Sequence, residues 1–590
     1  MATMKYCMLP PMDKFSIFDY LVIGIYLASM VVMGILFSGR QKSLKEYFHA
    51  GGDLPWWAVG ISLIATHLSP ISYLALPGWI FERDTRSTIT GGFIEFLMVL
   101  PTAALWIPIW ARLRVLSIYE YLERRFHPGV RSIGAMLFIV YTVFWLSTAL
   151  VTASKGFESV SGFDGRLCLL VIGLLGAFYT VLGGMRAVIW TDVVQYVVFV
   201  CGYLMIAIVL LSYFDPMEIW ALASNQISER TGHPHTKLIS HEWSMAVEGT
   251  LWVLLSGSVV RALAFGTNQI TVQRMHATRD RRTMFKALLA NAVTGYGFVL
   301  FTVPVAWGFV AYYSQHPELK RQVTHPDMVL PHFVLLNLPL IMRSLVMGGV
   351  LAALMSTFDS ALNSMSNVTN HDFYRRYLKP NRSEDHYVRV AKLLTLGFGL
   401  VLLGFALSQY EQQKGTAGEH FTRLTSLVSA PIGAFFVLGI LSRRANTPGV
   451  LCGAVAAIAL SLGFNGLPPV VQPVLNKTTL FAVDSSIPEG LDQGVVSARL
   501  AGRFRTHGIV LRSDAVVLIR EEGRRWDIRN GELFYLLERK GEVVTVAHEP
   551  ISWMWIPVLS MVVNLLVGFL ASFLFARPHP ERLVGLTLTG

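Results

Sequence analysis

Long apolar runs recur along almost the whole chain, and they constrain the fold more than any other feature. A helix needs about 18 apolar residues or more to cross a bilayer. Of the 590 residues, 53% are hydrophobic and only 15% are charged, which is typical of a protein with many membrane spans. Thirteen runs are long enough, and they predict spans near 16–38, 55–80, 91–113, 131–154, 165–185, 187–212, 247–270, 285–313, 331–366, 388–412, 422–441, 448–465 and 551–576.

The same composition excludes several classes of function. The net charge of +11 does not indicate nucleic acid, because the basic residues lie in short loops between the apolar runs. Three of the four cysteines, Cys168, Cys201 and Cys452, lie inside apolar segments, and no pair has metal-ligand spacing. The first run, 16–37, is too long for the apolar part of a signal peptide and predicts a retained span.

Basic residues are concentrated in alternate loops. The intervening loops, such as 81–88 and 409–421, are mixed or poor in bases. By the positive-inside rule, this asymmetry predicts an outside N-terminus and a cytoplasmic C-terminus. The basic loops contain Arg40, Lys42, Lys45, Arg112, Arg114, Arg124, Arg125, Arg274, Arg279, Arg281, Arg282, Arg375, Arg376, Lys379, Arg443 and Arg444.

Two of the apolar runs contain residues that break helices. Pro70 and Pro77 interrupt the run 55–80, and proline removes a backbone donor and clashes with the preceding turn. In 247–270, the residues 256–258 (Ser-Gly-Ser) and Gly266 weaken the helix. Interrupted helices at corresponding positions of two halves indicate the binding site of a transporter.

Counting five spans from each break gives two units, 55–212 and 247–441. Because each unit has an odd number of spans, the two units must have opposite orientations in the membrane. The remaining divisions are an extra N-terminal helix and first cytoplasmic loop (1–54), an additional helix and loop (442–484), an insert (485–549), and a last span with a short tail (550–590).

The segment Leu351–Ser366, LAALMSTFDSALNSMS, places hydroxyls, an amide and a carboxylate inside an apolar run. Small residues with hydroxyls also let membrane helices pack closely, but packing does not explain Asp359. A carboxylate in a span is costly and usually marks an ion or proton path. Oxygen ligands packed this densely suit a hard cation such as sodium.

With these features in place, the chain resembles the sodium/solute symporter family. That resemblance implies an all-α integral membrane protein of about thirteen transmembrane helices with a five-plus-five inverted repeat, the LeuT-like fold. It covers roughly residues 16–465 and the last span. The motifs that carry it are RQKSLKEYFHAGGDLPWWAVGISLIAT (40–66), SIYEYLERRF (117–126), GGMRAVIWTDVVQ (183–195), NQITVQR (268–274) and LAALMSTFDSALNS (351–364).

The resemblance implies where sodium, the co-transported ion, binds. The main site would use carbonyls at the break of the first repeat helix and hydroxyls on the eighth core helix. Some members hold a second cation between the fifth and eighth core helices. A second carboxylate could strengthen cation binding or hold a proton, because neighbouring acids raise each other's pKa. The matching residues are Ala65, Leu68, Ala353, Ser356 and Thr357 for the main site, and Asp192, Ser356, Asp359 and Ser360 for the second.

The solute site is less clearly predicted. The family's sugar-binding positions match Gly92 and Thr294, so that set is absent, and 139–151 lacks the base of sialic acid carriers. Arg261 is the mid-membrane base present instead. It could anchor an anion, or form an internal ion pair with Glu95 or Asp192. The candidate solute residues are His67, Ser69, Ser72, Glu95, Phe144, Arg261 and Phe265.

Two of these candidates have an alternative reading. His67 could coordinate the solute or shuttle a proton, or it could be a satisfied polar residue of the cavity wall. Phe144 could stack on a ring in the cavity, or it could be a packing aromatic.

Between residues 485 and 549 the composition changes to short β-branched stretches separated by Gly, Asn and Asp. This pattern predicts a small β domain, which the span count places outside the cell. The family normally has a short connection at this point, so the role of the insert is open.

The sequence therefore predicts a sodium-coupled symporter that imports a small solute, such as a sugar or carboxylate, by alternating access. We expect a functional monomer in the cell membrane, with a lipid but no nucleic-acid partner. An alternative is a membrane sensor that uses 485–549 as its outside input domain. No nucleophile–base arrangement or nucleotide-binding glycine motif indicates an enzyme or an ATP-driven pump.

Overall fold

The structure is a computed structural model of the chain. It describes residues 15–37, 43–182, 184–228, 231, 233–243, 245, 248–323, 325–411, 417–466 and 552–587, together with the backbone of six strands between 470 and 548. Arg40, Lys42, Gly183 and most of the predicted insert lie outside the described residues.

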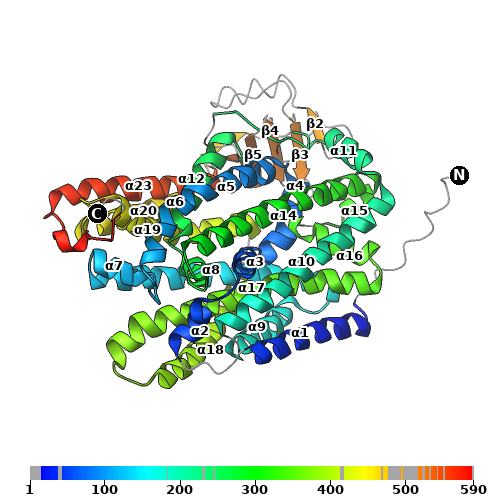
Figure 1. Ribbon diagram of the computed structural model, residues 1–590. Helices are drawn as coiled ribbons and strands as arrows, with labels where there is room; N and C mark the ends of the chain where they lie inside the picture. Colours follow the sequence, from blue (N-terminus) through cyan, green and yellow to red (C-terminus); the bar gives the residue numbers. More distant parts are fainter. Residues whose placement is uncertain are drawn as a thin grey trace.

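Helices occupy every apolar run that the sequence singled out (Figure 1). Short π-helical turns at Ile71–Ala75, Arg86–Thr90 and Thr369–Leu378 continue some of them. The helices are α1 (Ile17–Phe37), α2 (Leu44–His49), α3 (Trp56–His67), α4 (Leu76–Glu82), α5 (Gly91–Leu97), α6 (Val99–Arg112), α7 (Tyr119–Arg125), α8 (Pro128–Ser161), α9 (Gly165–Leu182), α10 (Met185–Tyr213), α11 (Pro216–Asn225), α12 (Leu251–Phe265), α13 (Gln269–Met275), α14 (Arg281–Gln315), α15 (Pro317–Lys320), α16 (Val329–Asn337), α17 (Leu340–Val368), α18 (Glu384–Gln409), α19 (Ala417–Leu441), α20 (Thr447–Gly466) and α23 (Ile556–Ala571).

In the part of the chain that the structure describes, nine helices are long and apolar enough to cross a membrane. The number rises to twelve if each of three bent helix pairs counts as one span. The predicted multi-pass helical membrane protein is therefore confirmed. The apolar part of α9, Gly165–Ala177, falls short of the length of a span in the described residues.

The first predicted helix break is present. Helix α3 ends at His67, and the chain turns by 70° before it continues through Ile71–Ala75 into α4. Pro70 lies at the turn, where its missing N–H and its ring prevent the helix from continuing. The main-chain carbonyls at the end of α3 are thereby left without helical partners.

The second break is present at only one of its two predicted positions. Residues 256–258 lie inside the uninterrupted helix α12, so the prediction of a break there was wrong. Glycine and serine weaken a helix, but inside a membrane a helix is the only local way to satisfy the backbone. The chain bends instead by 59° after Phe265, at Gly266.

Two tryptophans of α6 hold this second bend. Trp106 Nε1 donates to the Ala262 carbonyl at 3.1 Å, and Trp110 Nε1 donates to the Gly266 carbonyl at 2.9 Å. A Cβ on Gly266 would lie 2.1 Å from the Trp106 ring, so this close approach requires glycine. The bend is therefore fixed by tertiary contacts that no local pattern contains.

Two further interruptions differ from the sequence prediction. Helices α5 and α6 meet at a 43° bend beside Met98, because in a straight helix the ring of Pro101 would clash with the carbonyl four residues earlier, at Leu97. The predicted run 331–366 divides at Leu338 and Pro339 into α16 and α17.

Helix α17 lies at the centre of the helix bundle. It packs along α10 and also contacts α1, α3, α8, α9 and α18. From Val346 to Val368 every side chain is buried, including the polar ones. The hydroxyls and the carboxylate of this helix therefore face protein, as ionisable groups inside a membrane should.

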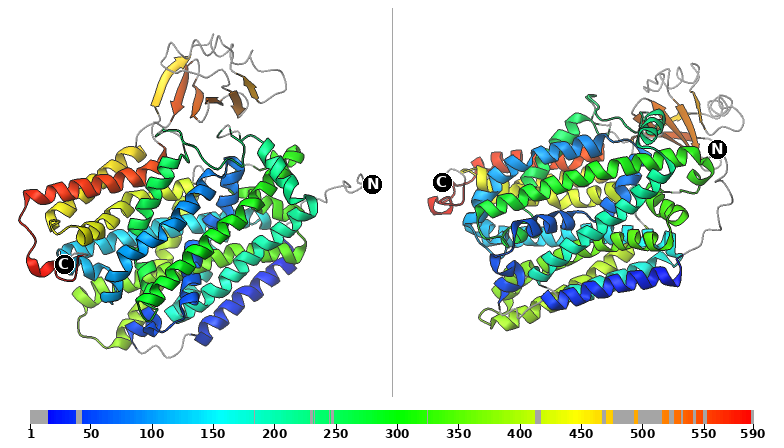
Figure 2. Two further views of the ribbon diagram at one scale, coloured as in Figure 1. Left: turned by 45° about the horizontal axis from the view of Figure 1, so that its top comes forward. Right: turned by 45° about the vertical axis from the view of Figure 1, so that its right-hand side comes forward.

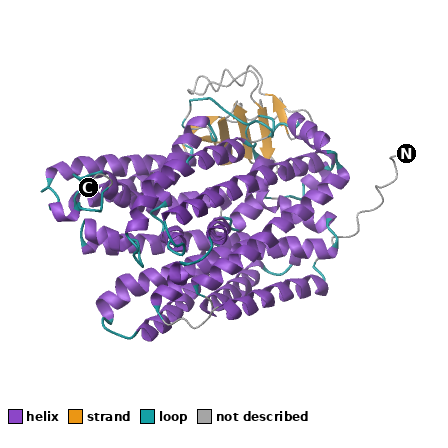
Figure 3. Ribbon diagram, viewed as in Figure 1, coloured by secondary structure: helices purple, strands orange, loops and turns teal. Residues whose placement is uncertain are grey.

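Six strands form one antiparallel sheet, which lies above the helices in the left view of Figure 2 and is coloured orange in Figure 3. Their order is β1-β6-β5-β4-β3-β2, so β1, which precedes the predicted boundary at 485, pairs with the last strand. The strands are β1 (Val470–Leu475), β2 (Gln493–Val495), β3 (Val516–Arg520), β4 (Arg525–Asn530), β5 (Leu533–Lys540) and β6 (Val543–His548).

Candidate ion and solute site

Two neighbouring hydroxyls of α17 reach the carbonyls at the broken end of α3. Ser356 Oγ donates to the Ala65 carbonyl at 2.9 Å, and Thr357 Oγ1 donates to the Thr66 carbonyl at 3.1 Å. Both residues are buried. The hydrogen bonds therefore join the centre of the bundle to the helix that Pro70 interrupts.

Each hydroxyl has a second carbonyl within reach on its own helix. The Ala353 carbonyl lies 3.2 Å from Ser356 Oγ and 2.9 Å from Thr357 Oγ1. A hydroxyl carries one proton and two acceptor lone pairs. If the protons turn toward Ala353, the hydroxyl oxygens and the Ala65 carbonyl become free to coordinate a cation.

A small pocket lies at the same place. Four of its lining residues are predicted sodium ligands: Ala65, Leu68, Ala353 and Ser356. The described residues contain no cluster of three or more His, Cys, Asp or Glu side chains that could hold a metal ion. Neutral oxygens from carbonyls and hydroxyls instead suit a hard monovalent cation.

Gln195 of α10 lines this pocket and was missed by the sequence prediction. Its side chain is buried, and neither Oε1 nor Nε2 has a hydrogen-bond partner among the described residues. A buried amide without partners is costly, so its oxygen is available to an ion in the pocket. The signal was its place three residues after Asp192, because one helical turn puts both side chains on neighbouring faces.

Asp192, a predicted second-cation ligand, is fully buried on α10 and paired with an arginine. Arg274 Nη2 lies 3.2 Å from Asp192 Oδ2, and neither side chain is exposed. Ser62 Oγ of α3 donates to the same Asp192 oxygen at 2.5 Å. The sequence prediction that Arg274 is a cytoplasmic loop charge was wrong, because α13 turns inward after Gly266 and buries it.

The predicted second-cation residues lie in two groups. Arg274 contacts Ser360 as well as Asp192, and Ser360 Oγ is 3.0 Å from Thr66 Oγ1. Asp359 instead accepts a hydrogen bond from Thr180 of α9 at 2.5 Å. The Arg274 guanidinium thus occupies the position between Asp192 and Ser360 where a second cation was expected.

Helix α13 contributes a further polar connection that sequence reasoning missed. Gln273 Nε2 donates to Asn363 Oδ1 at 2.9 Å, and Ser364 Oγ donates to Gln273 Oε1 at 3.0 Å. Gln269, four residues earlier, receives the N–H of Ile118 at 2.9 Å. The i, i+4 spacing of the two glutamines was the available signal, since it places both on one helical face.

Of the predicted solute residues, the structure brings His67 and Phe265 together. Their ring centroids are 6.2 Å apart, and the His67 ring stacks at 6.3 Å on Trp145 of α8. Thr271 Oγ1 lies 3.4 Å from His67 Nε2. The two helix breaks and the middle of α8 therefore meet at an aromatic cluster with polar edges.

The remaining solute candidates lie elsewhere or have other contacts. Ser69 is buried in the break itself and Ser72 is half-buried one turn later. Phe144 stacks on Phe405 of α18 at 5.5 Å, which is the packing role considered for it.

Arg261 forms an ion pair with Glu95 of α5. The two side chains are 56% and 47% exposed, so the pair does not lie in the buried centre. Of the partners considered for Arg261, Asp192 is instead bound to Arg274. Arg261 is therefore paired with an acid of the same protein. Its charge is already neutralised, and no unpaired charge on Arg261 is left for an anionic solute to bind.

Comparison with known proteins places this geometry in context. The model of the sodium:solute symporter family matches residues 47–457. The sodium/sialic acid symporter NanT of Aliivibrio fischeri is 30% identical over 455 residues, which cover 76% of this chain and 88% of that protein. The human sodium-coupled monocarboxylate transporter 1 is 27% identical, with 79% of this chain and 76% of that protein covered.

The fold is also that of a solved transporter. A structure of a Na⁺-coupled sialic acid symporter in a substrate-bound outward-open state matches 95% of this chain and 99% of its own, with a TM-score of 0.73 and 24% identity. At this identity the likeness shows the fold.

A test of the paired acids follows from these contacts. Asp192→Asn leaves the Arg274 cation buried without its acid, which should cost about 3–5 kcal/mol and lower the thermal unfolding temperature. Asp359→Asn leaves the Asp192–Arg274 ion pair intact and should lower the unfolding temperature much less. Both variants should change the charge moved per solute or its pH dependence, measured as currents in proteoliposomes. If both leave these properties at wild-type values, the two acids are structural only.

Proposed function

The chain belongs to the sodium:solute symporter family, and from this membership and the geometry of the site we propose that Ser356 and Thr357 bind the coupling sodium ion. The protein is a secondary symporter that couples import of a small solute to sodium, and it is not an enzyme. The family's curated relatives are transporters, and none of the comparisons favours a membrane sensor.

One observation carries the proposal for the main sodium site. The hydroxyls of Ser356 and Thr357 contact carbonyls of α3 beside its break, and Ala353 offers each hydroxyl an alternative acceptor. Ala65, Leu68 and Ala353 complete the proposed ligand set, and Gln195 lines the same pocket. The ion would replace hydrogen bonds that already hold the two helices together.

Substitution of the two hydroxyls tests this site. Ser356→Ala and Thr357→Ala each remove one oxygen ligand from a cation, so the sodium concentration for half-maximal uptake should rise about tenfold. Ser366→Ala is the matched control, because Ser366 is equally buried on α17 but donates to Ala391 of α18 at 2.7 Å. Wild-type sodium dependence in both site variants would show that the ion binds elsewhere.

For the second site, we propose that Asp192, Asp359 and Ser360 respond to a second cation or a proton. Arg274 bridges Asp192 and Ser360. A second cation could therefore bind between these two residues only by displacing the Arg274 guanidinium. A proton requires no such displacement, because it can be added to the Asp359 carboxylate, which accepts a hydrogen bond from Thr180 at 2.5 Å, without entering the space between Asp192 and Ser360.

We further propose thirteen spans arranged as two inverted units, 55–212 and 247–441, with the N-terminus outside. Counting α9 and each bent pair as one span gives this number and puts the strands and the loop before α12 outside the cell. Ser552, which follows the strands, donates its N–H to the Met245 carbonyl at 2.7 Å. This contact supports placing the strands on the same side as that loop. A functional monomer remains our expectation.

Cysteine labelling tests the topology. In a variant without native cysteines, Trp243→Cys should react with an impermeant thiol reagent in intact cells, because Trp243 is 75% exposed in the loop that contains Met245. Arg389→Cys, at the exposed start of α18, should react only after the membrane is opened. The opposite labelling pattern would reverse the orientation.

For the solute, we propose a binding position at the aromatic cluster of His67, Trp145 and Phe265. These rings meet at the two helix breaks, and Thr271 supplies a polar group nearby. An aromatic face favours a solute with a ring or another flat apolar surface, and His67 can donate or accept a hydrogen bond. Arg261 is neutralised by Glu95, so the site gives no reason to require an anion.

A pair of matched analogues tests this view of the solute. A carboxylate and its amide should compete for uptake within about threefold of each other, because no unpaired cation distinguishes them. The ratio should be the same in Arg261→Gln, while Trp145→Ala should weaken both competitors. A strong preference for the carboxylate that Arg261→Gln abolishes would restore Arg261 as an anion anchor.

A further inference from the structure

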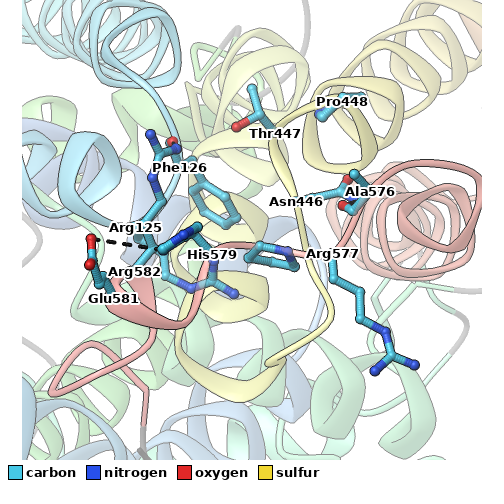
Figure 4. Close-up of a pocket in the computed structure, with 11 residues that line it drawn as sticks. Arg125, Phe126, Asn446, Thr447, Pro448, Ala576, Arg577, His579, Glu581 and Arg582 are labelled. Atoms are coloured by element: carbon cyan, nitrogen blue, oxygen red, sulfur yellow. Dashed lines mark hydrogen bonds and ion pairs between the residues drawn. The ribbon is translucent and has the colours of Figure 1, made fainter.

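A pocket of about 430 Å³ lies far from the sodium and solute sites, where the C-terminal segment folds back against the helix bundle. Figure 4 shows residues of three segments around it: the end of α7, the start of α20 and the chain after α23. The fold-back is held by hydrogen bonds from Tyr121 and Arg112 to the carbonyls of Leu586 and Gly585. Three distant parts of the sequence thus build one pocket.

The lining of this pocket is strongly basic. It contains Arg125, Arg577 and Arg582, against a single carboxylate, Glu581, which lies 3.8 Å from His579. Within the described part of the chain, none of the three arginines forms an ion pair with an acid. The charges of Arg125 and Arg582 lie close enough to repel each other, which favours an added anion beside them.

Arg125 is the buried member of this group, with 1% of its surface exposed. Its Nε and Nη2 donate to the carbonyls of Gly439, Ser442 and Ala445 at 2.7 to 3.1 Å, so it caps the end of α19. Its Nη1 is buried and has no hydrogen-bond partner. A buried guanidinium N–H without a partner is costly, and an anion in the pocket would supply one.

Electrostatics at Arg125 agree with this geometry. Burial lowers the pKa of the Arg125 guanidinium from its ordinary value, and the charge of Arg582 lowers it further. Arg582 itself donates to the Phe126 carbonyl, which fixes it beside Arg125. The first residues of α20, Thr447 and Pro448, also line the pocket, so the positive end of a 20-residue helix faces it.

We propose that this pocket binds a phosphate-bearing anion. Arginine recognises phosphate oxygens through charge-assisted hydrogen bonds, and the dipole of the helix that begins beside the pocket favours a negative charge there. In the proposed topology the pocket opens at the cytoplasmic surface, where both anionic phospholipid headgroups and free phosphates are available. Either source offers the same group, and bound anion would hold the C-terminal segment against α7.

Free phosphate is the first arm of the test. Inorganic phosphate is titrated into the full-length protein in neutral detergent by calorimetry, with chloride at equal ionic strength as the reference. Saturable binding is expected, and Arg582→Gln should weaken it about tenfold. Arg389→Gln, an exposed arginine at the start of α18, should bind as the wild type does.

Lipid is the second arm. The same proteins are placed in nanodiscs of phosphatidylcholine, with and without phosphatidylglycerol, and their unfolding temperatures are compared. If the source is a headgroup, phosphatidylglycerol raises the unfolding temperature of the wild type and of Arg389→Gln, but not of Arg582→Gln. A response in either arm that depends on Arg582 supports the site and identifies its source.

The proposal is overturned if neither phosphate nor phosphatidylglycerol has an effect, or if Arg582→Gln responds as the wild type does in both arms. Arg125→Gln is unsuitable as the main variant, because it also removes the cap of α19. Arg577→Gln provides the second variant, since Arg577 makes no hydrogen bond to another described residue. These readouts do not involve transport, so they are independent of the proposed sodium site.

Discussion

The hydrogen bonds from Ser356 and Thr357 to the end of α3 are the contact on which the centre of this protein depends. A helix that stops inside a membrane leaves carbonyls without partners, and each unsatisfied carbonyl there costs several kcal/mol. The chain compensates by placing two hydroxyls of the buried part of α17 opposite those carbonyls. The break in α3 is therefore tolerated only where α17 supplies donors, and this requirement fixes the two helices relative to each other.

A second constraint is the charge on Asp192. A carboxylate buried on α10 must be neutralised, and the second bent helix delivers the neutralising group, because α13 turns inward after Gly266 and carries Arg274 to Asp192. Ser62 of α3 hydrogen-bonds to both partners, at 2.5 Å to the carboxylate and 2.9 Å to the guanidinium. The two broken helices are thus tied to α10 and to each other by one buried polar group.

The sequence predicted those parts of the fold that local chemistry determines. The spans follow from apolar length, and the break at Pro70 follows from proline stereochemistry. The motif match also brought Ala65, Ala353, Ser356 and Thr357 to one place, as the structure does. Predictions from local sequence failed at positions whose conformation or partner depends on tertiary contacts.

Three residues illustrate that failure. Gly257 does not break α12, whereas Gly266 does, because Trp106 and Trp110 bind the carbonyls near Gly266 alone. Arg274 belongs by sequence to a basic loop, and only the inward turn of α13 shows that it is an internal counter-ion. The ion-pair partner of Arg261 could not be chosen from the sequence either, because both Glu95 and Asp192 were candidates. In the structure Asp192 pairs with Arg274, and Arg261 pairs with Glu95.

The same hydroxyls that stabilise the break also explain how an ion could control it. Without sodium, the Ser356 proton can point to Ala65 across the helix contact. With sodium, it must point away from the ion, and Ala353 on its own helix is the acceptor at hand. The free energy that joins α3 to α17 would then come from ion coordination instead of hydrogen bonds, and so would depend on the sodium concentration. Because α3 also carries His67 at its broken end, sodium binding and the shape of the proposed solute position would be set by the same segment of backbone.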